Sequence, residues 1–190
     1  GMVGGRPCTW TYRQLLAEAN RIAHVLTEDL GLVPGNRVLL RAPNNPMFAA
    51  SWLAVMKAGG VAVSTMQLLR ARELQPIIGK ARIGLALCDV RLVAELQSAA
   101  AHCPDLRRIV CFNHDGPGSL EAMAAAKPIE FDNVDTAAED PALIAFTSGT
   151  TGLPKAARLS HMRFLGVGDG MSAVAGYGRD EVIACVLPLF

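Results

Sequence analysis

No stretch of this sequence is long and apolar enough to cross a membrane. A spanning helix needs about 18 or more consecutive apolar residues. The most apolar neighbourhood, residues 47–66, is interrupted by Lys57, Gly59 and Gly60. No secretory signal pattern is found at the amino terminus. We therefore expect a soluble, cytoplasmic protein with no membrane span.

An excess of charge of one sign is also missing. Eighteen lysines and arginines stand against 17 acidic residues, which gives a net charge of +1. A nucleic-acid-binding surface needs clustered basic residues that neutralise phosphates, and no basic run occurs. The composition therefore disfavours a nucleic-acid partner.

The five cysteines offer neither a disulfide framework nor a zinc module. Their number is odd and no Cys-x-x-Cys pair occurs. A metal site built from His102, Cys103, Cys111 and His114 is conceivable, but its spacing matches no common zinc motif. Cys111 also lies inside "RRIVCF", which is typical of a strand. A metal site here is the weaker interpretation.

What the sequence does have is apolar material and clear helix signals. Hydrophobic residues make up 51% of the chain and charged residues 18%. This composition is enough to build a sizeable core. Thr11 and Gln14 have the spacing of a capping box at a helix start. Apolar residues follow at helical spacing up to Gly31. A second helix is predicted where Asn45 would cap and Pro46 would occupy the first position.

Strand and helix patterns then alternate. We expect strands at 37–42, 60–65, 83–88, 107–112, 142–147 and 182–187, and helices at 46–57, 71–82, 91–101, 119–126 and after Ser160. Apolar strands joined by helices are typical of a parallel sheet covered on both sides. The predicted fold is α/β, a doubly wound, largely parallel sheet flanked by helices on both faces.

The segment "FTSGTTGLPKAARLSH", residues 146–161, directly follows the strand-like run "ALIAF". In open α/β sheets, ligands bind beyond the carboxyl ends of the strands. Gly149 and Gly152 would allow several backbone amides to point at one anion. Hydroxyl donors and one cation complete a set suited to a polyphosphate: Thr147, Ser148, Thr150, Thr151 and Lys155.

The residues alone leave two interpretations open. The segment is not the common P-loop, because Lys155 comes three residues after Gly152 rather than directly after it. No Gly-x-Gly-x-x-Gly follows a strand, which argues against a Rossmann dinucleotide site. Clusters of Gly, Ser and Thr are often plain solvent loops without a ligand. Phosphate binding and a plain loop both remain possible from composition.

"TSGTTGLPK", residues 147–155, resembles the phosphate loop of the adenylate-forming (AMP-binding) family, which includes acyl- and aryl-CoA ligases, luciferases and peptide-synthetase adenylation domains. The segments 10–26, 54–65 and 186–190 also resemble that family. Residues 41–60 and "PKAARLSH" look most like ligases for aromatic acids, the 2-aminobenzoate type in particular. One departure is Ala156, since most relatives have glycine after the loop lysine.

The resemblance implies a two-step reaction. A carboxylate attacks the α-phosphorus of ATP to give an acyl-adenylate and pyrophosphate, and the thiol of coenzyme A then displaces AMP. It implies that residues 148–152 cradle the phosphates, that Thr147 is a magnesium ligand, and that Lys155 is a catalytic residue holding the outer phosphate. His161 is a weaker candidate, since a histidine at a helix start more often makes only local hydrogen bonds.

The resemblance also implies an organisation. Residues 1–35 would belong to a neighbouring part of a large domain, and residues 36–190 would form the α/β subdomain with the phosphate loop. The family's acid pocket, its magnesium-binding glutamate, its ribose-binding aspartate and its carboxy-terminal domain are not recognised here. We therefore expect an amino-terminal fragment that is inactive by itself. Two alternatives stay open, an adenylation domain that loads a carrier protein and a stand-alone, non-catalytic nucleotide-binding module.

Overall fold

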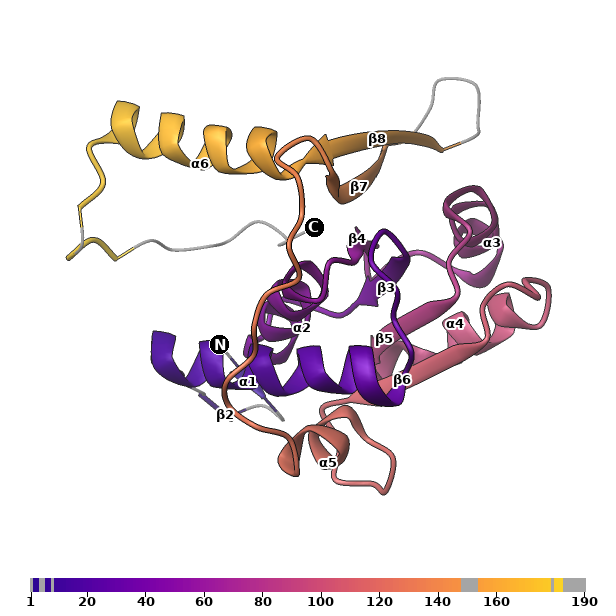
Figure 1. Cartoon of the computed structure of the whole chain (residues 1–190). Helices are drawn as coiled ribbons and strands as arrows, with labels where there is room; N and C mark the ends of the chain where they lie inside the picture. The colour runs from indigo at the N-terminus through magenta and orange to yellow at the C-terminus, as the bar shows by residue number, and fades with distance from the viewer. Residues whose placement is uncertain (1, 4–5, 8, 148–153, 179, 183–190) are drawn as a thin grey trace.

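The computed structural model describes residues 2–3, 6–7, 9–147, 154–178 and 180–182. Its centre is a six-stranded sheet with the order β6-β5-β3-β4-β7-β8 (Figure 1). Strands β3 to β7 pair in parallel, and β8 is antiparallel to β7. The strands are β3 (Arg37–Arg41), β4 (Val61–Ser64), β5 (Leu85–Asp89), β6 (Arg108–Phe112), β7 (Pro141–Thr147) and β8 (Lys155–Ser160). A short antiparallel pair, β1 (Met2–Val3) and β2 (Arg6–Pro7), precedes them.

Helices cover both faces of this sheet, as predicted. One face packs against α1 (Tyr12–His24), α2 (Pro46–Lys57) and α5 (Leu120–Ala125), and the other against α3 (Ala71–Ala81) and α4 (Val93–Ala100). A π-helical turn, Val25–Asp29, extends α1, and a 3₁₀ turn, Val90–Leu92, precedes α4. Successive side chains of a strand point to opposite faces of the sheet, so the core has two parts. Leu40 of β3 packs with the α1, α2 and α5 side, and its neighbour Leu39 packs with the α3 and α4 side. The α/β fold class is confirmed.

The helix starts expected from the sequence are confirmed in atomic detail. The Gln14 amide donates to Thr11 Oγ1 at 3.2 Å, and the Thr11 amide donates to Gln14 Oε1 at 2.8 Å. These two bonds complete the capping box. Asn45 Oδ1 accepts from the Phe48 amide at 2.9 Å at the start of α2. Such signals are local, so the sequence carries them without help from the rest of the fold.

The end of the described chain differs from the prediction. Residues 155–160 form β8, whereas the sequence pattern indicated a loop leading directly into a helix. The prediction was wrong because "KAARLS" lacks β-branched and aromatic residues, and the strand exists through its pairing with β7. Ser160 caps α6 (His161–Ala175) as expected. Of the predicted strand at 182–187, only residue 182 belongs to the described part of the chain.

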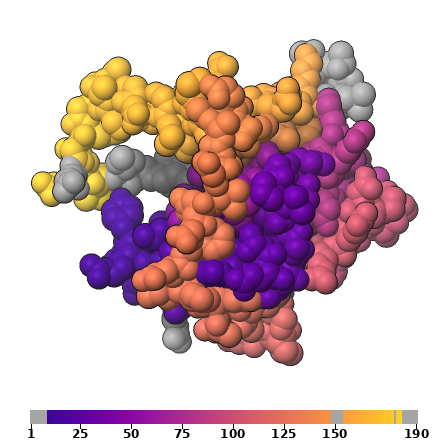
Figure 2. All heavy atoms as spheres, viewed as in Figure 1, coloured from indigo at the N-terminus to yellow at the C-terminus, as the bar shows by residue number. Residues whose placement is uncertain are grey.

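An extended segment, residues 126–140, links α5 to β7 and crosses α1 and α2 on the way (Figure 1). Figure 2 shows it, in orange, lying over the indigo surface of the first helices. Asn20 Nδ2 donates to Ile129 O at 2.7 Å, and the Val134 amide donates to Lys57 O at 2.9 Å. We call this segment the strap, because it ties β7 to the opposite end of the molecule.

Among the described residues, no helix has both the length and the apolar character that a membrane span requires.

Candidate phosphate-binding site

Two of the predicted site residues face each other across a strand pair. Thr147 is the last residue of β7, Lys155 is the first of β8, and the two are direct partners in the antiparallel ladder. Directly opposite residues project from the same face of a sheet. Thr147 and Lys155 therefore stand opposite each other, on one face, at the end of the β7–β8 ladder. The other predicted residues, 148–152, lie outside the described residues.

The end of β7 extends beyond its pairing with β4. Strand β7 runs parallel to β4, with Leu143 beside Ala62, and it continues past the end of β4 as far as Thr147. Ile144 and Phe146 anchor it in the α3–α4 side of the core. The exposed end of β7 is thus positioned by one buried and one partly buried side chain of the same strand.

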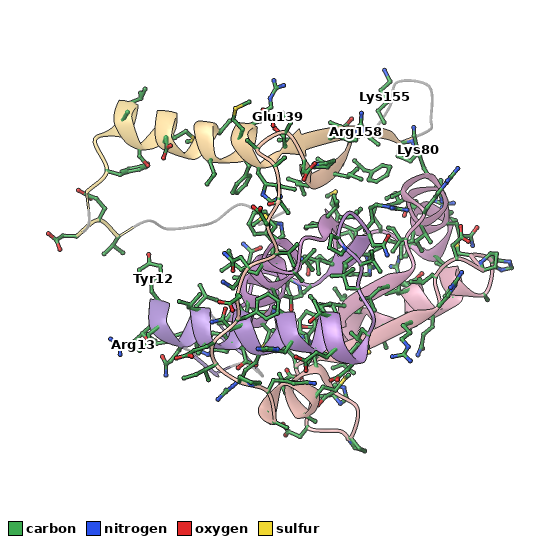
Figure 3. All side chains as sticks on the ribbon, viewed as in Figure 1. Tyr12, Arg13, Lys80, Glu139, Lys155 and Arg158 are labelled. Atoms are coloured by element: carbon green, nitrogen blue, oxygen red, sulfur yellow. The ribbon has the colours of Figure 1, made fainter. Side chains whose placement is uncertain are left out.

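A second lysine approaches the same turn from another element. Lys80, in the last turn of α3, donates through Nζ to the carbonyl oxygen of Pro154 at 3.0 Å. Figure 3 shows Lys80 beneath the start of β8, in the same corner of the molecule as Lys155. Sequence reasoning missed Lys80 because it lies 74 positions away from Pro154 along the chain. Only the packing of α3 against β7 reveals it.

His161 is not brought to the turn. Ser160 pairs with Pro141 at the far end of the β7–β8 ladder, and the His161 amide donates to Asp140 O at 3.1 Å. The histidine is thus separated from Thr147 and Lys155 by the length of the hairpin. Its backbone contact is the local kind expected at a helix start.

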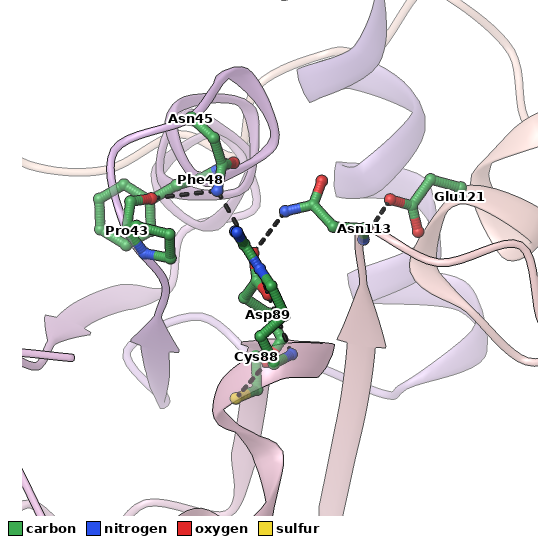
Figure 4. Close-up of polar contacts among 8 residues, drawn as sticks. Pro43, Asn45, Phe48, Cys88, Asp89, Asn113 and Glu121 are labelled. Carbon is green, nitrogen blue, oxygen red and sulfur yellow. Dashed lines mark hydrogen bonds and ion pairs between the residues drawn. The ribbon is translucent and has the colours of Figure 1, made fainter. Parts of the chain in front are cut away.

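A second group of polar residues lies at the carboxyl ends of β5 and β6 (Figure 4). Asp89 is fully buried and accepts two hydrogen bonds from the Arg91 guanidinium, at 2.8 Å each, and one from Asn113 Nδ2 at 2.6 Å. Asn45 Nδ2 adds a longer contact at 3.5 Å. Burial alone would raise the pKa of Asp89. The bonds from Arg91 and Asn113 outweigh it and lower that pKa below its usual value.

The neighbouring acid is perturbed in the opposite direction. Glu121 Oε1 accepts a hydrogen bond from the backbone amide of Asn113 at 2.6 Å. Asn113 itself has a φ of +62°. Burial raises the pKa of Glu121, whose second carboxylate oxygen is buried without a partner among the described residues. These residues fix the end of β6 against α5 and the start of α2, so we assign them a structural role.

Sequence analysis did not single out Arg41, although a charged residue inside an apolar strand indicates a buried polar contact. It is buried at the end of β3 and donates to the carbonyl oxygens of Met66, Gln67 and Leu69, at 2.6 to 3.0 Å. Arg41 thus holds the loop after β4 in place through these three hydrogen bonds.

A cleft of about 300 Å³ opens beside Arg41. The two other arginines that line it are already paired with carboxylates, Arg70 with Glu95 at 3.0 Å and Arg91 with Asp89 at 2.8 Å. Their charges hold neighbouring elements together, so this cleft is a weaker candidate for an anion site than the turn between β7 and β8.

Within the described part of the chain, no group of three or more His, Cys, Asp or Glu residues is arranged to hold a metal ion.

The comparisons with known proteins agree on one family. The family model described as "AMP-binding enzyme" matches residues 2–190. The human mitochondrial acyl-coenzyme A synthetase ACSM1 is 31% identical over 83% of this chain, which spans 28% of the relative. The salicyl-AMP ligase / salicyl-S-ArCP synthetase of Mycobacterium tuberculosis is 31% identical over 93% of the chain and 32% of the relative. The chain therefore covers only about a third of these relatives' lengths.

Solved structures give the same picture. ATP-bound MatB from Rhodopseudomonas palustris superposes with a TM-score of 0.84 at 31% identity, over 94% of this chain and 35% of that one. The anthranilate CoA ligase AuaEII, in complex with anthranoyl-AMP, gives a TM-score of 0.74 at 26% identity, over 80% of this chain and 28% of that one. One of these neighbours is thus described with ATP bound and the other with an acyl-adenylate.

Proposed function

Because the chain belongs to the AMP-binding family of adenylate-forming enzymes, we propose that it is the phosphate-binding part of an ATP-dependent acid–CoA ligase. The whole enzyme would join a carboxylate to AMP with release of pyrophosphate, and then transfer the acyl group to coenzyme A. The observation that carries this proposal is the pairing of Thr147 with Lys155 at the end of the β7–β8 ladder. The ATP-bound relative supports the choice of nucleotide.

In this proposal Lys155 holds the outer phosphates as pyrophosphate leaves. Its charge lies where negative charge develops, and a preorganised charge of this kind favours the transition state. Residues 148–152 would supply backbone amides and hydroxyls to the phosphates. Lys155 is exposed at the strand end, so its ammonium can meet a ligand from solvent.

Magnesium would lie beside Thr147. The ion prefers oxygen ligands in octahedral geometry and commonly takes them from substrate phosphates and water. A threonine hydroxyl fits such a set as one ligand. In this proposal the phosphates of ATP and solvent supply most of the others. When bound, the ion would neutralise charge on the phosphates.

We propose an aromatic acid as the substrate class, with coenzyme A as acceptor. Two relatives are named for aromatic acids: the salicyl-AMP ligase, and the 2-hydroxy-7-methoxy-5-methyl-1-naphthoate–CoA ligase of Streptomyces carzinostaticus. The anthranilate ligase is a structural neighbour. A carrier protein is the second candidate acceptor, because the salicyl relative is named as a salicyl-S-ArCP synthetase. We place the enzyme in the cytoplasm.

We further propose that residues 1–35 and 36–190 belong to different parts of the whole enzyme's large domain. In the present chain α1 packs on α2, within one core cluster. The division concerns how a longer protein would be organised. By themselves, these 190 residues would bind phosphates but form no acyl-CoA.

Pyrophosphate exchange tests the proposal. In the complete enzyme that carries this sequence, radiolabelled pyrophosphate should enter ATP only when an acid is present, and aromatic acids should be better than fatty acids. Lys155→Ala should slow the exchange by about a hundredfold or more. Exchange at the full rate in this variant would remove Lys155 from the mechanism. Thioester formed with coenzyme A, or only with a carrier protein, then identifies the acceptor.

A further inference from the structure

His24, the last residue of α1, lies where the helix, the π-helical turn after it and the strap meet. The strap crosses α1 on its way from α5 to β7 (Figure 1). The side chain of His24 is only 18% exposed. Its ring packs edge-on against Phe131 of the strap, with the ring centroids 4.9 Å apart and 85° between the ring planes. The ring is therefore held between α1 and the strap.

Both ring nitrogens of His24 meet oxygen atoms. Nδ1 lies 2.6 Å from Glu28 Oε1, in the π-helical turn, and Nε2 lies 2.8 Å from the backbone oxygen of Glu130, in the strap. A carbonyl oxygen only accepts hydrogen bonds, and an ionised carboxylate does the same. If Glu28 is ionised, each ring nitrogen therefore needs a proton of its own to make its bond.

Glu28 is held in its ionised form. Lys127 Nζ donates to Glu28 Oε2 at 2.9 Å, and this bond, together with the one from His24, lowers the pKa of the Glu28 carboxyl. A carboxyl group with a lowered pKa has no proton to donate at neutral pH. The hydrogen between Glu28 and His24 therefore comes from the histidine ring.

The number of protons on the ring decides which bonds it makes. A neutral imidazole has one N–H and one lone pair, whereas the imidazolium has an N–H on both nitrogens. Only the imidazolium can donate to Glu28 and to Glu130 at once. In the neutral ring, a nitrogen lone pair would face an oxygen lone pair, which is repulsive. The charged carboxylate of Glu28 is the stronger acceptor, so the remaining proton should stay on Nδ1 and the bond to the strap should be lost.

The charged groups of the elements around the ring have other partners. They are Glu18 and Arg21 of α1, Glu28 and Asp29 of the π-helical turn, Glu121 of α5 and Lys127 of the strap. Glu130 and Asp132, also in the strap, are exposed residues. Of the side-chain types in this group, histidine is the one that ordinarily changes charge between about pH 5 and 8.

We propose that His24 is a proton-dependent latch for the strap: the protonated ring holds the backbone of Glu130 against α1, and loss of one proton releases it. The release would be local, because Asn20 Nδ2 still donates to Ile129 O at 2.7 Å and Lys127 still pairs with Glu28 and Asp29. The strap leads directly into β7. The inference does not depend on the proposed function, because it concerns only α1, the turn after it and the strap.

A pH titration of the isotopically labelled chain, followed by nuclear magnetic resonance, tests the latch. The carbonyl carbon of Glu130 and the amide of Phe131 should shift with the same midpoint as the His24 ring, and the neutral ring should carry its proton on Nδ1. His24→Gln should abolish these shifts. His102→Gln is the matched control. It makes the same change at an exposed histidine and should leave the titration of the strap as in wild type.

Glu28→Gln changes the partner of the ring and leaves the ring itself intact. The glutamine amide can donate to Nδ1, so the neutral ring can keep its proton on Nε2 and stay bonded to Glu130. Lys127 keeps Asp29 as a partner at 2.7 Å. In this variant the His24 ring should still titrate, but the shifts of Glu130 and Phe131 should be lost. If His24→Gln does not fold, this variant decides by itself.

Four results would overturn the latch. The first is a wild-type strap whose signals at Glu130 and Phe131 stay constant while the His24 ring titrates. The second is a neutral wild-type ring with its proton on Nε2, because the bond to the strap would then survive. The third is a Glu28→Gln variant whose strap shifts as much as in wild type. The fourth is loss of the strap shifts in His102→Gln, which would assign them to another histidine.

Discussion

At the scale of single residues, Asp89 is a buried carboxylate held in its charged form. Burial opposes the charge, yet the bonds from Arg91 and Asn113 lower its pKa. A pKa that is lowered in the folded state gives stability at all pH values above the unfolded pKa. That contribution is lost as the pH falls through the folded value.

Asp89→Asn should therefore reduce the free energy of unfolding by about 1–3 kcal/mol at pH 7, because Arg91 and Asn113 lose their charged acceptor. The difference between wild type and variant should shrink as the pH falls below about 4, where the unfolded aspartate protonates. Urea titrations at pH 7, at pH 5 and at pH values of about 4 and below measure the loss of stability and its dependence on pH.

The control for this prediction is Asp115→Asn, a change of the same chemistry at an exposed position. Its free energy of unfolding should stay within about 0.5 kcal/mol of wild type, as is usual for surface substitutions. A difference between Asp89→Asn and wild type that stays constant across pH would contradict a charged Asp89.

Among the elements, the strap leads into β7 and lies close against the turn after α2. Gly59 has a φ of +71°, and a Cβ there would come within 2.8 Å of Val134 Cγ1. The strap and the α2–β4 turn are therefore fitted to each other at a position that only glycine occupies without strain.

Gly59→Ala should lower the free energy of unfolding by about 1–3 kcal/mol, through backbone strain and the clash with Val134. Gly118→Ala is the matched control, since its φ is +81° but no described atom lies within 4 Å of its Cβ position. It should show the backbone cost alone. Val134→Ala in the Gly59→Ala background should recover part of the loss. Equal costs at both glycines and no recovery would contradict the close fit of the strap.

For the molecule as a whole, α6 stands out because it has no buried residue, although it carries many apolar side chains. Its contact with the body includes the rings of Phe164 and Trp52, whose centroids lie 5.0 Å apart. Exposed apolar patches favour association. Leu165 and Met171 are 64% and 62% exposed, so this chain should associate through α6 at high concentration.

The double variant Leu165→Glu, Met171→Glu should keep the chain monomeric and leave its unfolding midpoint nearly unchanged, because neither side chain is buried. Sedimentation velocity over a range of concentrations measures this. Tyr12→Glu changes another exposed side chain, on α1, and should not alter the association. Association that persists in the double variant would place the associating surface elsewhere.

The sequence predicted what depends on neighbours along the chain. Thr11 and Asn45 cap their helices as expected, and the apolar strands up to β7 take their predicted positions. It missed β8, which exists only through its pairing with β7, and it missed Lys80, which reaches the turn only through tertiary packing. Long-range contacts leave no trace in local composition. The phosphate loop was recognised through its resemblance to a family, since its glycines and hydroxyls alone fit a plain loop equally well.

The proposed function of this chain depends on phosphates binding at the turn between β7 and β8. The decisive experiment is a titration of the isotopically labelled chain with Mg-ATP, followed by amide chemical shifts. We predict shifts centred on Thr147 and Lys155, and their loss in Lys155→Gln. Shifts centred instead on the arginine-lined cleft of about 380 Å³ at the amino ends of the strands, around Arg37 and Arg108, would contradict binding at the turn. So would unchanged binding by Lys155→Gln.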